Sequence, residues 1–150
     1  MGRYIQAESG ENELIFGLKV FLLRLRRHWR WLWQRRAFAQ TFVRDLSAFP
    51  YQVLEHRSPL IRRFPKVDLS LQYNKVHNLR LAIPRLNNLL LGPGETFSFW
   101  YLVGPPTRRR GYREGLEFRN GEVTSGVGGG LCQLSNLLFW LALRLDLEIV

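Results

Sequence analysis

Hydrophobic residues recur at helical spacing over much of the front of the chain. From Leu14 to about Gln40 the apolar positions return every three or four residues, which predicts one long amphipathic helix. A second helical pattern runs from Leu69 to about Leu91, and Pro84 lies inside it. Because proline removes a backbone donor and clashes with the preceding turn, we expect a kink or two helices there.

Shorter elements are expected in the back half of the chain. Residues 96–102 form a compact aromatic segment, which is typical of a strand. Two more strands are expected over 115–119 and 122–125, since the Asn120-Gly121 pair between them suits a type I′ turn. The segment 131–147 is apolar nearly all round, which predicts a buried helix. The predicted fold is therefore α+β, with a long N-terminal amphipathic helix, a kinked helical region, a small antiparallel sheet with a hairpin, and a buried helix that bears the cysteine.

Positive charge is concentrated in the front of the chain. The net charge is +10, of which residues 1–66 contribute +8 and residues 67–150 contribute +2. Prolines at positions 50, 59 and 65 interrupt the segment 49–66, which predicts a connector without regular secondary structure there. We accordingly divide the chain into a basic amphipathic helical region with its connector over 1–66 and a second domain over 67–150.

Two interpretations of the basic helix remain open. Three tryptophans, Trp29, Trp31 and Trp33, stand among its arginines, and such a helix over residues 14–40 could lie on an anionic membrane surface. Alternatively its apolar side packs on the rest of the protein and its arginines are solvated. Nucleic-acid binding is not expected, because the chain has the charge but no recognisable motif, and only 3 of its 22 basic residues are lysines.

Composition excludes several classes of protein. At 46% hydrophobic residues the chain can bury a core, so it is not disordered throughout. One cysteine excludes an intrachain disulfide, and with three histidines it excludes a Cys-rich zinc site, so we expect no metal or cofactor. We find neither an apolar run long enough to span a bilayer nor the basic start of a signal peptide. The expected location is the cytoplasm or the inner membrane surface.

The segment that carries candidate chemistry is GVGGGLCQLSN, residues 126–136. Cys132 directly follows Gly128-Gly129-Gly130-Leu131, at the expected first turn of a helix. The unpaired N–H groups and positive end of a helix stabilise a thiolate, and glycines let the backbone approach a substrate closely. The N–H groups of Gly130, Cys132 and Gln133 can face an oxyanion formed on an attacked carbonyl.

Two further side chains share the helix face of the cysteine, because Ser135 and Asn136 lie three and four residues after it. A nucleophilic Cys132 is not the only interpretation. Buried structural cysteines are common, and glycine loops before helices also bind phosphate, although a Walker loop needs a lysine that is missing here. A nucleophile also needs a base, and no pattern places one of the three histidines (His28, His56 and His77) beside the cysteine.

Residues 74–147 resemble the VanW-like family, which is named after an accessory protein of vancomycin-resistance clusters. The basic aromatic front also resembles family members without a signal or extra domains. The matching residues are NKVHNLRLA (74–82), PGETFSFW (93–100), Gly104, Gly111-Tyr112, Asn120-Gly121 and GVGGGLCQLSNLLFW (126–140).

The resemblance implies an activity. Some VanW-like domains are linked to cell-wall chemistry as cysteine-dependent L,D-transpeptidases, and Cys132 matches their nucleophile. The implied partner is a peptidoglycan stem peptide or another envelope component. Family members continue past this point with a His-containing segment that could supply the base, so we expect this chain to be either truncated or a degenerate form, with the usual source of the base beyond Val150. The alternative is a non-catalytic accessory or binding module associated with glycopeptide resistance, in which Cys132 is structural.

Overall fold

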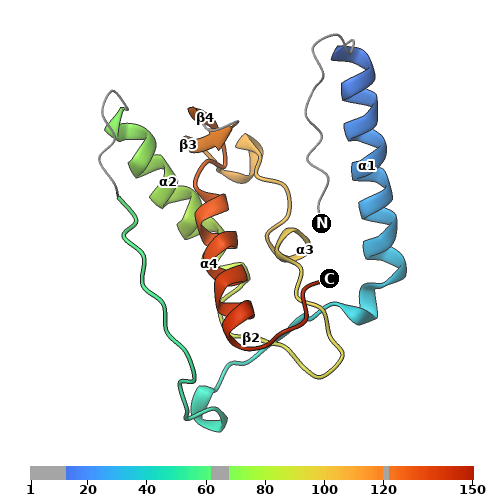
Figure 1. Cartoon of the computed structure of the whole chain (residues 1–150), viewed down its shortest axis with the longest axis vertical. Helices are drawn as coiled ribbons and strands as arrows, with labels where there is room; N and C mark the ends of the chain where they lie inside the picture. The colour runs from blue at the N-terminus through green and yellow to red at the C-terminus, as the bar shows by residue number, and fades with distance from the viewer. Residues whose placement is uncertain (1–12, 62–67, 120–121) are drawn as a thin grey trace.

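The computed structural model describes residues 13–61, 68–119 and 122–150 (Figure 1). Within these ranges the fold is α+β, as predicted, because helices are combined with two small antiparallel sheets. The helices are α1 (Glu13–Trp33), α2 (Leu69–Ala82), α3 (Phe99–Val103) and α4 (Leu131–Arg144). Short 3-10 turns connect them: η1 (Arg35–Ala37), η2 (Leu46–Ala48), η3 (Ile83–Arg85) and η4 (Arg108–Arg110).

The predicted hairpin is present and is longer than expected. Strands β3 (Glu114–Arg119) and β4 (Glu122–Val127) pair antiparallel along their whole length, with Arg119 opposite Glu122. This register leaves a two-residue connection, whose Asn120-Gly121 turn lies outside the described residues. A second, much shorter sheet pairs β1 (Thr41–Phe42) with β2 (Leu89–Leu90), also antiparallel.

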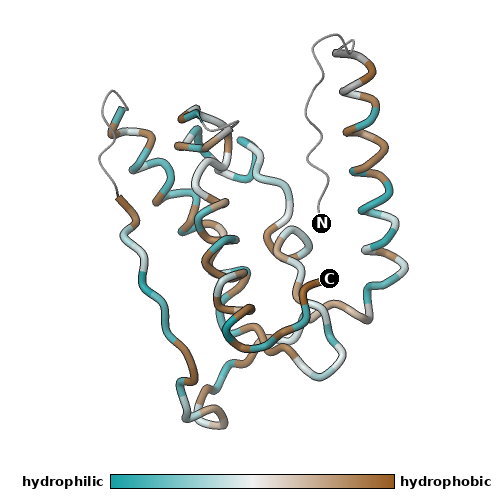
Figure 2. The backbone as a smooth tube through the Cα atoms, viewed as in Figure 1, coloured by the Kyte–Doolittle hydropathy of each residue, from teal (hydrophilic) through white to brown (hydrophobic). Residues whose placement is uncertain are grey.

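The long N-terminal helix is confirmed, but it ends earlier than predicted. The chain leaves α1 at Trp33 and enters η1 rather than continuing to Gln40. α1 stands beside the body of the protein, and brown apolar segments alternate with teal polar ones along its trace in Figure 2. One row of these residues, the apolar stripe, is between 45% and 83% exposed and consists of Ile15, Leu18, Phe21, Leu22, Leu25, Trp29, Leu32 and Trp33. The stripe is therefore not packed on the rest of the described chain.

The region around Pro84 breaks as expected, although it does not resume as a helix. α2 ends at Ala82, and Pro84 lies in η3, where a missing backbone donor costs little. Asn88 then adopts a positive φ of 61°, and the following residues pair in β2. The prediction that the helix continues to Leu91 is wrong, because the apolar residues Leu89 and Leu90 pair with β1 as a strand.

Asp68 caps the start of α2. Its carboxylate accepts a hydrogen bond of 2.6 Å from the Ser70 hydroxyl and one of 2.8 Å from the Ser70 backbone N–H. These bonds, the hydroxyl first, lower the pKa of Asp68 below its ordinary value.

This cap predicts a pH-dependent difference between the protein and an Asp68→Ala variant. A lowered pKa means that the stabilisation is fully present above the ordinary pKa of an aspartate and is lost as pH falls through the lowered value. We expect the variant to unfold at lower urea concentration at neutral pH, and the two midpoints to converge in acid. A gap that stays constant between neutral and acidic pH would contradict the charged cap.

The aromatic segment 96–102 is not a strand, so that prediction is wrong. Its second half forms α3, while Thr96 makes only an isolated parallel bridge to Phe38. Helical spacing places Phe99 and Val103 on the same side, where Val103 is fully buried and Phe99 packs against the core. Burial of this pair favours a short helix over the extended chain that the aromatic composition indicated.

The core is small and is assembled from distant parts of the sequence. Its buried cluster brings α2 together with α3, α4 and the segment before β3, and consists of Leu79, Ala82, Val103, Tyr112 and Leu131. The prediction that α4 is buried all round is wrong, since only its first residue belongs to this cluster. Phe139 and Leu143 on the same helix are about half exposed, at 50% and 52%. α4 is thus covered on one side only.

The described part of the connector, residues 49–61, runs back past α4 (Figure 1). The division of the chain at residue 66 stays a prediction. Among the described helices, none combines the length and the apolar character that crossing a bilayer requires.

Candidate functional site

Cys132 lies in the first turn of α4, as predicted, and its side chain is exposed. The residue before the helix is Gly130, which adopts a left-handed conformation with φ 98°. No side chain caps this helix start. A glycine cap leaves the first N–H groups open to another acceptor, which is the arrangement that an oxyanion site requires.

The backbone N–H groups at this helix start are not equally available. The N–H of Leu131 donates to the Gly128 carbonyl at 3.3 Å, and that of Gln133 donates to the Gly130 carbonyl at 3.0 Å. Among the described residues, the N–H groups of Gly130 and Cys132 make no hydrogen bond of this kind. Of the three donors expected to face an oxyanion, the structure therefore leaves two open, and Gln133 already has an acceptor.

A buried asparagine holds the glycine loop in place. Asn78 on α2 is fully buried, and its amide nitrogen donates to the carbonyls of Arg113 and Gly129 at 2.9 and 3.0 Å. Its amide oxygen accepts from the Arg113 N–H at 2.8 Å. The N–H of Gly128 completes the arrangement by donating to the Arg113 carbonyl at 3.0 Å. One side chain thus joins α2 to the start of β3 and to the loop before Cys132.

Each glycine of the loop is required by close packing against the protein itself. A Cβ on Gly128 would lie 2.4 Å from Cβ of Pro106, and one on Gly129 would lie 2.1 Å from the Gly115 carbonyl oxygen. A Cβ on Gly130 would lie 2.0 Å from Cγ of Lys75. Side chains would clash at all three positions, so the run of glycines has a structural cause whatever else it does.

Cys132 opens into a pocket of about 350 Å³. This volume is within the range of small-molecule sites, which is roughly 300–1,000 Å³. The wall combines apolar and polar side chains from α2, β3, α4 and the connector: His56, Ser58, Lys75, Leu116, Phe118, Gly130, Cys132, Gln133, Asn136, Leu137 and Trp140.

The connector forms one wall of this pocket because α4 binds it at two points. The Gln133 amide nitrogen donates to the Ser58 hydroxyl and to the Pro59 carbonyl, both at 3.2 Å. Two turns further along α4, the rings of His56 and Trp140 lie 4.3 Å apart between centroids. These contacts bring a histidine into the pocket that contains Cys132.

The predicted site residues separate into two groups. Gly130, Cys132, Gln133 and Asn136 line the pocket, whereas Gly128, Gly129 and Ser135 do not. The Ser135 hydroxyl donates to the Cys132 carbonyl at 3.1 Å. The two predicted glycines outside the pocket are buried against Pro106 and Gly115.

The three histidines differ in where they lie relative to the pocket. His28 bonds the Arg24 carbonyl on α1 at 2.7 Å, and His77 bonds the Gly111 carbonyl at 3.0 Å. Only His56 lines the pocket, and sequence reasoning missed it because the connector carries no pattern that places it. Trp140 could have been found, since Cys132, Asn136 and Trp140 follow at steps of four on a helix.

The side chains that could bind a metal ion are His, Cys, Asp and Glu. Over the ranges that the structure describes, no three His, Cys, Asp or Glu side chains gather as ligands of a metal ion.

Comparison with known proteins relates the chain to one family. Residues 74–150 match the family model described as "VanW like protein". The chain is 44% identical over 113 residues to the vancomycin B-type resistance protein VanW of Enterococcus faecalis, an alignment that covers 75% of this chain and 40% of that protein. It is 42% identical over 77 residues to the uncharacterized protein YoaR of Bacillus subtilis, covering 51% of this chain and 25% of that protein.

The chain thus spans less than half the length of either relative. No solved structure matches it.

Proposed function

Because the chain belongs to the VanW-like family, we propose that it is a cell-envelope protein associated with vancomycin resistance, in which Cys132 is the nucleophile of an acyl transfer. The proposed substrate is an amide of a peptidoglycan stem peptide, the substrate class of the L,D-transpeptidase-like members. The observation that carries this proposal is the exposed thiol at an uncapped helix start, within a pocket that also contains a histidine.

The proposed reaction has two steps. In the first, the Cys132 sulfur attacks the amide carbon, and the electron pair of the C=O bond moves to oxygen. Collapse of this intermediate breaks the C–N bond, so that the amine leaves with a proton and the acyl group stays on sulfur as a thioester. In the second step an amine or water attacks the thioester carbon and gives up a proton to the base, the C–S bond breaks, and the sulfur leaves as a thiolate.

The open backbone donors fit the charge that develops in both steps. The N–H groups of Gly130 and Cys132 lie at the positive end of α4, where they can stabilise an oxyanion. Asn78 supports them indirectly, because its bond to the Gly129 carbonyl holds the peptide segment that carries the Gly130 N–H. We assign Asn78 a positioning role.

His56 is the candidate general base of this reaction. It lines the same pocket as Cys132, and its ring contacts that of Trp140 at a tilt of 43°, so the ring is held at the pocket wall. In this role it takes the thiol proton before attack and returns a proton to the leaving amine. The base then comes from the connector of this chain, in contrast to the expectation that it lies beyond Val150.

Covalent capture tests the acyl transfer directly. Incubating the full chain with a synthetic stem tetrapeptide should add the mass of the acyl fragment to the protein, and hydroxylamine should remove that mass, because thioesters are cleaved by it. Cys132→Ser should show no hydroxylamine-sensitive adduct. Absence of any adduct on the unmodified chain, at substrate concentrations well above those of the protein, would contradict the proposal.

Thiol alkylation tests the role of His56. We expect Cys132 of the unmodified protein to react with iodoacetamide at neutral pH on the order of tenfold faster than Cys132 of the His56→Gln variant. The reason is that the base makes the thiolate available. His28→Gln, which changes a histidine on α1, is the matched control and should react like the unmodified protein. Equal rates for all three proteins would remove His56 from the mechanism.

A second function has a specific observation in its favour. All three loop glycines are required by packing against Pro106, Gly115 and Lys75, so this loop would be needed even in a protein without catalysis. In that case the chain is an accessory or binding module of the envelope, and Cys132 is a structural residue. Two results together would favour this second function. The unmodified chain forms no adduct, and the Cys132→Ser variant binds stem peptide with the same affinity as the unmodified chain.

A further inference from the structure

The apolar stripe of α1 is turned away from the protein, and we infer that it binds an anionic lipid surface. Within the stripe, Phe21 is 61% exposed, Leu32 70% and Trp33 83%. Contiguous exposed apolar patches are rare on soluble proteins and mark sites of contact with proteins or membranes. A 21-residue helix is about 31 Å long, so the stripe offers an extended contact surface.

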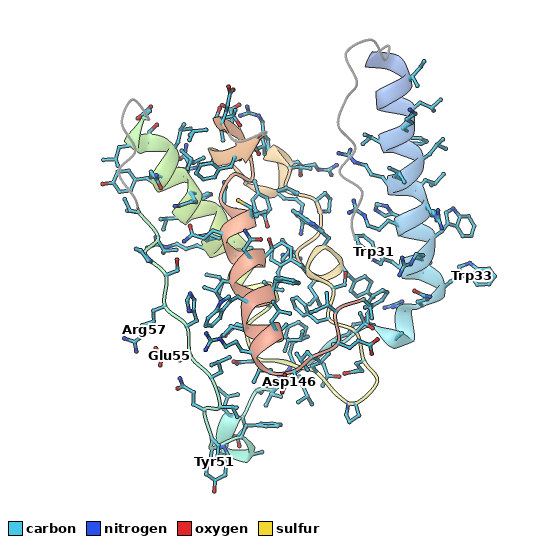
Figure 3. The ribbon with its side chains drawn as sticks, viewed as in Figure 1. Trp31, Trp33, Tyr51, Glu55, Arg57 and Asp146 are labelled. Carbon is cyan, nitrogen blue, oxygen red and sulfur yellow. The ribbon has the colours of Figure 1, made fainter. Side chains whose placement is uncertain are left out.

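A different side of α1 faces the body of the protein. Trp31 packs edge-on against Tyr101 with 5.8 Å between ring centroids, and Trp31 and Val20 are half-buried. Figure 3 shows Trp31 pointing toward the body and Trp33 pointing away from it. The helix can therefore keep its contact with the body while its apolar stripe binds another surface.

The charges around the stripe select the kind of surface. Residues 14–44 contain eight Lys and Arg and no Asp or Glu. Lys19, Arg26 and Arg30 each directly follow a stripe residue, so they lie along one edge of the stripe. When such a helix lies in the plane of a bilayer surface, apolar side chains enter the acyl boundary and the cationic ends of the edge residues reach the headgroups.

A lipid surface fits these features better than a second copy of the chain. Two copies joined through their stripes would bring cation-rich edges together, and α1 has no acid after Glu13 to offset their repulsion. Anionic headgroups supply the opposite charge along the whole edge. Trp29 and Trp33, one turn apart in the stripe, are also side chains that favour the membrane–water interface.

Vesicle binding by the full chain tests this inference. We expect the protein to sediment with vesicles of equimolar phosphatidylcholine and phosphatidylglycerol, with a blue shift of tryptophan fluorescence, and to bind vesicles of phosphatidylcholine alone at least about tenfold more weakly. Leu22→Gln with Leu25→Gln removes apolar contact without changing charge, and Arg26→Gln with Arg30→Gln removes two edge charges. Each pair should weaken binding to the mixed vesicles on the order of tenfold.

The matched control is Arg85→Gln with Arg109→Gln, which removes the same charge from exposed positions on the body and should leave binding unchanged. An equal loss in the control and the edge variant would show attraction by net charge alone and would overturn the assignment to α1. Failure to sediment with either vesicle would overturn the inference. The inference would also be overturned if the protein does not bind vesicles but self-associates, and if Leu22→Gln with Leu25→Gln abolishes that self-association.

Discussion

Replacing Gly129 by alanine is expected to lower the free energy of unfolding by about 3 kcal/mol or more. The added Cβ would lie 2.1 Å from the Gly115 carbonyl oxygen and 2.8 Å from the Gly115 Cα. Both atoms are backbone, so no flexible side chain can move aside, and β3 or the loop before α4 must shift. Urea denaturation followed by circular dichroism measures the loss.

The same substitution at Gly17 is the matched control. Nothing lies within 4 Å of a Cβ built there, and the residue is inside α1. Alanine is favoured over glycine in a helix interior by about 0.5–1 kcal/mol, so Gly17→Ala should keep or slightly raise helix content. If Gly129→Ala unfolds at the same urea concentration as the unmodified protein, the close approach of the loop to β3 is not as described.

Replacing Asn78 by aspartate is expected to cost about 3 kcal/mol at neutral pH. The new side chain has nearly the same shape and can still accept from the Arg113 N–H. It loses the two donors to the carbonyls of Arg113 and Gly129, and it places a buried carboxylate against their oxygens. Because burial and these oxygens favour the protonated form of the introduced carboxyl, the loss should shrink as pH falls.

Asn87→Asp provides the comparison, since Asn87 is exposed and the chemical change is identical. Its effect should stay within about 0.5 kcal/mol at neutral pH. The positioning role of Asn78 has a separate readout, the rate at which iodoacetamide modifies Cys132. In urea-free buffer, where both variants are folded, Asn78→Asp should alter that rate and Asn87→Asp should not. A stability loss without any change in the rate would leave Asn78 a purely structural residue.

Several features of this protein are determined by the sequence near them. Leucines and tryptophans at helical spacing correctly predicted α1, and the Asn120-Gly121 pair between two strand-like segments correctly predicted the β3–β4 hairpin. Cys132 could be placed at a helix start because glycines end the preceding strand and an apolar run follows them. Each of these features depends on residues that are close together in the sequence, and such interactions can be predicted from local patterns.

Other features were decided by tertiary contacts. Segment 96–102 has strand-like composition, yet burial of Val103 in the shared core makes its end helical. α4 is apolar nearly all round, yet only one side of it packs against the rest of the described chain. No local pattern could reveal either outcome, because burial depends on which distant residues come to lie against a segment.

The candidate site shows the same division. Cys132 and the loop glycines could be recognised in the sequence, whereas His56 reaches the pocket only because Gln133 and Trp140, more than 70 residues later, bind the connector. Asn78 bonds Gly129 across 51 positions of sequence. A hydrogen bond between distant residues leaves no periodicity or spacing in a single chain, so only the folded structure could bring these partners together.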